Sequence, residues 1–313
     1  MRQLSFAILL VGASIIGGCG DDGTTTTGSS AFDLSQIKLP GSTGDKTGDA
    51  ILGGIKTAGA VGKAAEDFTP EQEYYIGRAF TAGVFGKYKP FEDEAANLYL
   101  NELGSALASA SELPEVFSGY HFTILDSDEI NAFSAPGAFI CVTRGMLRCC
   151  ESEDSLAAVL AHEIGHVQNR HGVKAIKNSR AWDAAKTAGL EAAKAGGGRD
   201  IGALSGAFGD LVGDMTTEIM VKGYGRDLEK QADKDAVRIL SRVGYDPRAL
   251  ISMLQAMDKK LKPGGLDFAK THPKPADRIK SVQSLIDKSP APSAPPPARH
   301  ERFQKAMQKA IAP

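Results

Sequence analysis

His162 and His166 are the residues in this chain best placed to bind a metal ion. Four residues apart on a helix, they lie on one face about one turn from each other, so both imidazoles can reach the same ion. Glu163 is rotated from the first histidine by roughly 100° around the helix axis, close enough to act on a metal-bound water. The pattern His-Glu-x-x-His therefore predicts a hydrolytic zinc site, one Zn²⁺ per chain, with Glu163 as general base.

The segment before these histidines indicates that their helix is buried. Residues 157–161 read Ala-Ala-Val-Leu-Ala, an apolar run that argues against a solvated helix face carrying two histidines by chance. Burying imidazoles and a carboxylate without a metal or other polar partners would cost free energy. We therefore expect a zinc helix from about Asp154 to His171, terminated by Gly172.

A catalytic zinc ion usually has three protein ligands, so a third must come from another segment. Glu229 and Asp233 are four residues apart on a predicted helix over about 226–242 and face the same way. One carboxylate can bind zinc while the other orients a ligand histidine. A solvated charge pair is the alternative, and spacing alone does not choose. His171 is a rival ligand, but five residues beyond His166 it points off the metal face.

The elements that must position these residues are predicted to be mainly helical. Thr69-Pro70-Glu71-Gln72 is typical of a helix start with a capping box, and another helix is expected over about 92–109. Asp246-Pro247 starts one more helix after the 226–242 segment. The fold class is therefore α+β and mainly helical, with the His-Glu-x-x-His helix at the active site.

A small sheet is predicted between the early helices and the zinc helix. Segments 120–125 and 138–142 are β-prone, and 131–137 reads as a short extended piece ending in a turn. The connections are too short for helical crossovers, so we expect a mainly antiparallel sheet.

Both ends of the chain are predicted to lie outside a folded body over residues 66–288. Residues 1–18 read as a secretory signal peptide. Cys19 follows as in a bacterial lipobox and would become the lipid-modified N-terminus; an ordinary signal peptide with an incidental cysteine is the alternative. Residues 19–65 read as a flexible tether, or else an inhibitory pro-segment. Residues 289–313 read as a proline-rich linker and a tail that is weakly helical or disordered.

Composition excludes several classes of protein. A formal net charge of −2 gives no reason to expect nucleic acid as a partner. After the signal segment no window offers eighteen uncharged apolar residues, so we expect a soluble body held at the membrane only by the lipid anchor. Cys141, Cys149 and Cys150 allow either a disulfide from Cys141 to one of the other two or three buried thiols.

The chain resembles the HtpX-type and CAAX-prenyl-protease-type zinc metallopeptidases, which are gluzincins. The resemblance rests on His-Glu-x-x-His followed distantly by Glu-x-x-Ala-Asp at 229–233, and on segments 131–147, 244–247 and 271–279. Together these cover about residues 69–285. Without membrane helices, the chain is most similar to the small bacterial lipoprotein members.

The resemblance implies a zincin-like core in which His162, His166 and Glu229 bind zinc and Glu163 is the general base. Candidates for orienting a ligand or stabilising the transition state are Asp233, Arg226, Tyr224, His272 and Arg278. His272 has two other interpretations: it could block the open metal position, or be an ordinary loop histidine.

A sheet edge beside the cleft is expected at Asn131, Ala132 and Phe133. An extended substrate could add there as a strand. The alternative is that these residues form an ordinary core strand.

These observations predict an exported, lipid-anchored zinc endopeptidase on the periplasmic side of the inner or outer membrane. Its expected substrates are unfolded or misfolded proteins of the cell envelope. The first alternative is a latent or chaperone-like assembly factor with a zinc site. A purely structural zinc protein is disfavoured, because such a site normally has four protein ligands and no need for Glu163.

Overall fold

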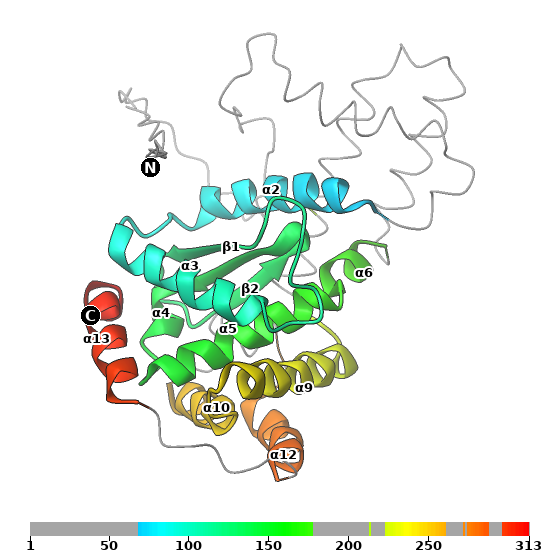
Figure 1. Cartoon of the computed structure of the whole chain (residues 1–313). Helices are drawn as coiled ribbons and strands as arrows, with labels where there is room; N and C mark the ends of the chain where they lie inside the picture. The colour runs from blue at the N-terminus through cyan, green and yellow to red at the C-terminus, as the bar shows by residue number, and fades with distance from the viewer. Residues whose placement is uncertain are drawn as a thin grey trace, which may run out of the picture. The chain divides into compact units, whose positions relative to one another are not determined.

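The computed structural model describes residues 68–177, 213, 223–260, 272, 274–287 and 296–312 (Figure 1). The predicted signal peptide, Cys19 and the tether lie outside these residues. Within the described residues, no helix combines the length and apolar character needed to cross a membrane. The α+β, mainly helical fold class is confirmed.

The sheet has three strands in the order β1-β3-β2, with β1 at His121–Leu125, β2 at Ala132–Ala135 and β3 at Phe139–Thr143. β3 pairs antiparallel with β2 but parallel with β1. The prediction of a mainly antiparallel sheet is therefore wrong for one of the two pairings. The chain first places β2 at the far edge and then reverses through η4 (Pro136–Ala138) into the centre. That reversal makes β1 and β3 run the same way without a helical crossover.

Two N-terminal helices pack beside the sheet. α2 (Pro70–Lys87) begins with the predicted capping box: Thr69 Oγ1 accepts from the Gln72 amide, and Gln72 Oε1 accepts from the Thr69 amide. α3 (Glu94–Ala108) starts after Asp93, whose carboxylate accepts from Ala96 N.

The side chains of α3 satisfy the outer edge of β1. Asn101 accepts from Phe122 N and donates to Phe122 O, while Asn97 accepts from Ile124 N. In the strand order β1-β3-β2, β2 forms the opposite edge of the described sheet.

The central helix of the body is α5 (Glu153–Gln168), whose residues from Glu153 to His166 are all buried. It ends earlier than predicted, and Gly172 does not terminate it. Asn169 Nδ2 donates to Gly165 O, and Arg170 takes a left-handed φ of 53°. The chain then restarts as α6 (His171–Lys177), which contains Gly172.

The remaining helices cover α5 and complete the core. Their bounds are α4 (Arg144–Leu147), α9 (Arg226–Val243), α10 (Arg248–Lys260), α12 (Pro275–Ile286) and α13 (Pro297–Ile311). α9 contacts α5 along its length, and α12 packs on α9 and α10 (Figure 1).

The predicted C-terminal tail is part of the folded body. Phe303, Met307 and Ala310 of α13 are buried in the main hydrophobic core, and the helix packs on α3, α4 and α5. Arg302 pairs with Glu153 in the first turn of α5. The body therefore continues past residue 288, because the proline-rich segment is followed by a helix with an apolar face.

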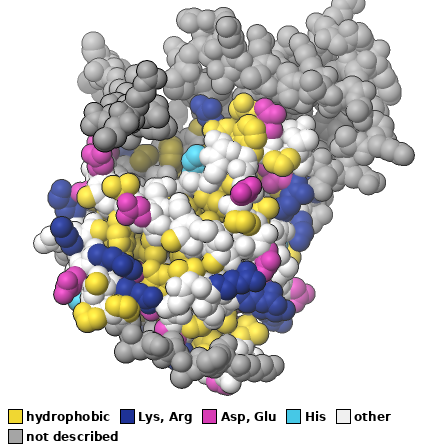
Figure 2. Space-filling model, in the orientation of Figure 1, with side chains coloured by type: hydrophobic (Ala, Val, Ile, Leu, Met, Phe, Trp, Pro, Cys, Tyr) yellow, Lys and Arg dark blue, Asp and Glu magenta, His cyan; other side chains and the backbone are white. Residues whose placement is uncertain are grey.

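The surface carries mixed charge. Figure 2 shows acidic and basic side chains interspersed with apolar ones on one face of the described body. This distribution agrees with the small formal net charge of −2.

Of the two predicted states of the cysteines, a disulfide or three buried thiols, the structure shows buried thiols. Cys141, Cys149 and Cys150 are free and buried. Burial raises the pKa of Cys141 to about 12, so this thiol stays protonated and is a poor nucleophile.

Candidate metal centre

The centre is built where α5 and α9 pack closely together. His162 and His166 project from α5, and Glu229 and Asp233 project from α9. Gly165 permits the close approach, because a Cβ at this position would lie 2.9 Å from Ala232 O. Replacing Gly165 would therefore push the ligands of one helix away from those of the other.

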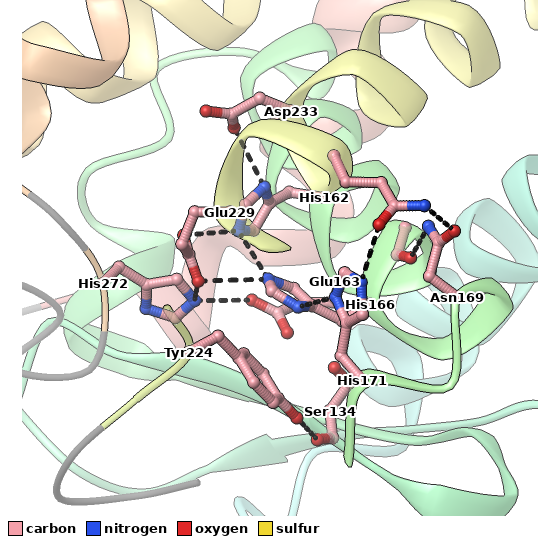
Figure 3. Close-up of polar contacts among 12 residues, drawn as sticks. Ser134, His162, Glu163, His166, Asn169, His171, Tyr224, Glu229, Asp233 and His272 are labelled. Atoms are coloured by element: carbon pink, nitrogen blue, oxygen red, sulfur yellow. Dashed lines mark hydrogen bonds and ion pairs between the residues drawn. The ribbon is translucent and has the colours of Figure 1, made fainter. Parts of the chain in front are cut away.

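Four side chains converge on one point. The ligand atoms of His162, His166, Glu229 and His272 all lie within 4.8 Å of one another, and all four residues are buried (Figure 3). The two histidine Nε2 atoms are 3.1 Å apart, His166 Nε2 is 3.4 Å from Glu229 Oε1, and His162 Nε2 is 3.6 Å from Glu229 Oε2. Tetrahedral zinc with bonds of about 2.0–2.2 Å separates its ligand atoms by about 3.3–3.6 Å.

The surroundings of Glu229 also favour a metal ion at this point. This residue is 1% exposed, yet neither carboxylate oxygen has a hydrogen bond among the described residues. A buried carboxylate without such partners is unfavourable, and a divalent cation between it and two imidazoles would satisfy it. The residues present therefore fit a zinc ion.

Of the two carboxylates between which sequence spacing does not choose, Asp233 is the one that lies behind a candidate ligand. Its Oδ1 lies 3.0 Å from His162 Nδ1. Arg278 of α12 donates to both carboxylate oxygens, from Nη2 to Oδ1 at 2.5 Å and from Nε to Oδ2 at 3.1 Å. Burial opposes ionisation, but Arg278 and His162 hold the pKa of Asp233 well below its usual value. Asp233 is thus an ionised acceptor behind a candidate ligand.

Glu163 lies beside the candidate ligands with its carboxylate facing the cluster. Oε1 is 3.9 Å from His272 Nε2, and the residue is 1% exposed. Burial raises the pKa of Glu163 to about 7. A carboxylate with a pKa near neutrality can both take up and release a proton during a reaction.

His272 lies in the cluster, at the position of a fourth ligand. Its Nε2 is 3.7 Å from Glu229 Oε1, and the side chain is buried. With three other candidate ligands present, this third imidazole would be a fourth ligand and close a site that a catalytic zinc ion would leave open to water or substrate. The geometry therefore agrees with the interpretation of His272 as a blocking group.

Tyr224 and Arg226 have different surroundings. The Tyr224 ring stacks on His166 at 4.3 Å between centroids, and its hydroxyl donates to Ser134 O at 3.4 Å (Figure 3). Burial raises the pKa of Tyr224 above its usual value, so the hydroxyl remains a donor. Arg226 is exposed at the start of α9 and is not among the clustered residues.

The segment predicted to bind substrate as a strand lies at the edge of the sheet, but its side chains are buried in the core. Asn131 precedes β2, whose Ala132 and Phe133 pair with Val142 and Cys141 of β3. All four β2 side chains are buried, as the core-strand alternative states. The outer backbone of β2 remains the part available for strand addition in the described sheet.

Sequence reasoning missed the group of polar residues behind His166. His171 was considered only as a rival ligand, but its Nδ1 lies 2.8 Å from His166 Nδ1, on the side away from the cluster. Burial lowers the pKa of His171 to about 4. Gln231, Asn169 and Asp235 continue the contacts behind it. Gln231 and Asp235 are one turn apart on α9, but sequence spacing does not bring them to Asn169 at the end of α5.

Comparisons with known proteins agree with this geometry. Residues 94–286, more than half of the chain, match the model described as Peptidase family M48. The beta-barrel assembly-enhancing protease of Escherichia coli (strain K12) is 28% identical over 220 residues, covering 68% of this chain and 43% of the relative. The mitochondrial metalloendopeptidase OMA1 of Schizosaccharomyces pombe is 28% identical over 195 residues, covering 60% of this chain and 52% of the relative. The chain spans about half the length of these curated relatives.

Proposed function

Because the chain belongs to peptidase family M48, we propose that it is a zinc-dependent endopeptidase acting on unfolded or misfolded proteins of the bacterial cell envelope. The observation that carries the proposal is the convergence of His162, His166 and Glu229, with the Glu163 carboxylate at the same buried point. Bound zinc would supply a Lewis acid that polarises the scissile carbonyl and acidifies water.

Different residues of the protein then carry out proton transfer, ligand orientation and oxyanion stabilisation. Glu163 takes the proton of the attacking water and delivers it to the leaving amine. Asp233 and Arg278 keep His162 oriented through its Nδ1. Tyr224 is better supported than Arg226 as a donor to the developing oxyanion, because it stacks on His166 whereas Arg226 is exposed.

An unfolded segment is the substrate class best suited to a sheet edge. An extended chain pairing with the outer backbone of β2 uses main-chain hydrogen bonds, which every peptide offers. Such recognition selects weakly by sequence but strongly against folded structure. The resemblance of residues 1–19 to a lipoprotein signal and the name of the bacterial relatives support a role at the envelope, with a lipid anchor as the membrane attachment.

A second candidate function, a latent or chaperone-like envelope assembly factor, is favoured by one observation. His272 completes four candidate ligands, as expected of a zinc site that is seldom open. A factor of this kind would act on client proteins without needing the proton chemistry of Glu163.

The test is casein hydrolysis by zinc-loaded protein lacking residues 1–19, compared with Glu163→Gln. Loss of a general base costs about 10²–10⁴-fold in rate, so cleavage should fall to background while zinc remains bound. The matched control is Glu151→Gln, an exposed glutamate just before α5, which should cleave normally. Cleavage by Glu163→Gln would overturn the mechanism. Effects on client proteins that persist in this variant would favour the second candidate.

A further inference from the structure

We propose that His171 is a positioning residue that holds His166 in the tautomer able to bind metal, through a directed chain of hydrogen bonds ending at Asp235. The proposal rests on the zinc site of the proposed function and adds residues outside its ligand set. Proton donors and acceptors can be assigned one after another from Asp235 towards the metal centre; Figure 3 shows Asn169, His171 and His166 of this series.

At the Asp235 end of this series of hydrogen bonds, the partners of Asn169 fix the orientation of its side-chain amide. Asn169 Nδ2 lies 2.7 Å from Gly165 O and 2.6 Å from Asp235 Oδ2. A carbonyl and a carboxylate only accept hydrogen bonds, so the NH₂ group of Asn169 must face them. Its Oδ1 therefore faces Gln231.

The next two links follow from the same reasoning. Asn169 Oδ1 accepts from Gln231 Nε2, which turns Gln231 Oε1 towards His171, 3.3 Å from its Nε2. Because an amide oxygen only accepts, His171 must carry its proton on Nε2.

The last link reaches the candidate ligand. With the Nε2 proton of His171 directed at Gln231, the other ring nitrogen of this completely buried side chain faces His166. Its bare Nδ1 accepts from His166 Nδ1 at 2.8 Å. His166 then has no proton on Nε2, the atom that lies 3.4 Å from Glu229 Oε1 in the cluster. Every donor and acceptor along the chain agrees with metal binding through this nitrogen.

The two candidate ligand histidines are thus oriented by different means. His162 has the Asp233 carboxylate directly behind it, 3.0 Å from Nδ1. His166 has the neutral imidazole of His171 behind it. The carboxylate that ends this series of hydrogen bonds, Asp235, lies three side chains beyond His166. The neutral chain fixes the tautomer without adding another negative charge beside Glu163 and Glu229.

The primary test measures zinc affinity of the full chain by chelator competition in His171→Leu and His171→Asn. Leucine removes the acceptor, and loss of such a partner typically weakens metal binding about 10–100-fold. The side-chain oxygen of asparagine can take the place of Nδ1, so His171→Asn should recover most of that loss. His300→Leu, at an exposed histidine on α13, should bind zinc like the unchanged chain.

A spectroscopic test reads the tautomer directly. Only six histidines are present, so ¹⁵N-histidine labelling of the zinc-free chain should resolve the His166 ring. Its Nδ1 should be protonated in the unchanged chain and lose this preference in His171→Leu. Gln231→Leu alters an exposed residue, so it interrupts the series of hydrogen bonds without disturbing the core. In this variant His171 should no longer prefer to carry its proton on Nε2.

Three results would overturn the proposal: unchanged zinc affinity in His171→Leu, asparagine as weak as leucine, or a His166 ring protonated on Nε2 in the zinc-free chain. None of these readouts requires peptide cleavage. An intact tautomer effect in a chain that cleaves nothing would count against the proposed function alone. Normal zinc binding and cleavage in His171→Leu would count against this inference alone.

Discussion

Glu229 and Asp233 lie one turn apart on α9 and face the same buried point, but they have different partners. Asp233 is 3.0 Å from the Nδ1 of His162 and accepts two hydrogen bonds from Arg278. Glu229 approaches the Nε2 atoms of both α5 histidines and has no hydrogen bond among the described residues. Arg278 therefore distinguishes two chemically similar carboxylates: it donates to Asp233 but approaches Glu229 only at 4.0 Å, which supports Glu229 as the proposed metal ligand and Asp233 as the proposed orienting group.

Asp233→Asn should weaken zinc binding about 10–100-fold, because an amide is a poorer acceptor for His162 and removes the carboxylate nearest to Arg278. Chelator competition on the purified chain measures the change. Asp227→Asn is the matched control, since that side chain is on the same helix and is 97% exposed. Equal affinity in the two variants would show that His162 needs no carboxylate behind it.

His272→Ala should raise the rate of casein hydrolysis, because removing the fourth candidate ligand leaves a position open for water and substrate. If the arrangement with His272 at the fourth ligand position is favoured over the open one, each ~1.4 kcal/mol of that preference should give about a tenfold increase in rate. His300→Ala, at an exposed site, provides the comparison. A lower rate in His272→Ala would instead assign this histidine to stabilising the transition state.

Phe303→Ala should destabilise the whole body by about 3–5 kcal/mol, because a fully buried aromatic side chain is removed from the core. The shift in the urea unfolding midpoint measures this effect. Gln304→Ala changes the next, exposed residue of α13 and should shift the free energy of unfolding by less than about 0.5 kcal/mol. Similar midpoints would mean that α13 is not integral to the fold.

Acid should destabilise the contact between α5 and α13 through Glu153. Burial opposes its ionisation, but hydrogen bonds from Arg302, Tyr99 and Tyr245 lower its pKa below the usual value. A lowered folded pKa means that the stabilisation is complete above the unfolded pKa of about 4.3 and is lost as pH falls through the folded value.

The measurement is the free energy of unfolding between about pH 6 and pH 3. Glu153→Gln should flatten the loss of stability below about pH 4.3, whereas the exposed control Glu102→Gln should retain it. An unchanged acid profile in Glu153→Gln would remove this carboxylate from the explanation.

Much of the centre was predictable because its spacing is local. The pairs His162–His166 and Glu229–Asp233 are each separated by one helical turn, and helix geometry alone brings their members onto one face. The capping box at Thr69 is equally local. Zinc as the cofactor is confirmed by the family and by the cluster.

Other features needed the folded chain. The direction of the β1–β3 pairing depends on which strand takes the central position, and β-prone segments do not encode that order. The end of α5 depends on Arg170 adopting a left-handed conformation, so the later Gly172 was a misleading signal. The packing of α13 depends on its contacts with α3, α4 and α5, which lie far from it in the sequence.

The sequence by itself determined which residues could bind zinc and act on water, because helical spacing puts their side chains on common faces. Only the tertiary structure decided which carboxylate lies behind His162, that His272 joins the cluster, and that His171 lies behind His166. These relationships depend on distance and hydrogen-bond direction between segments far apart in the chain, which residue spacing does not specify.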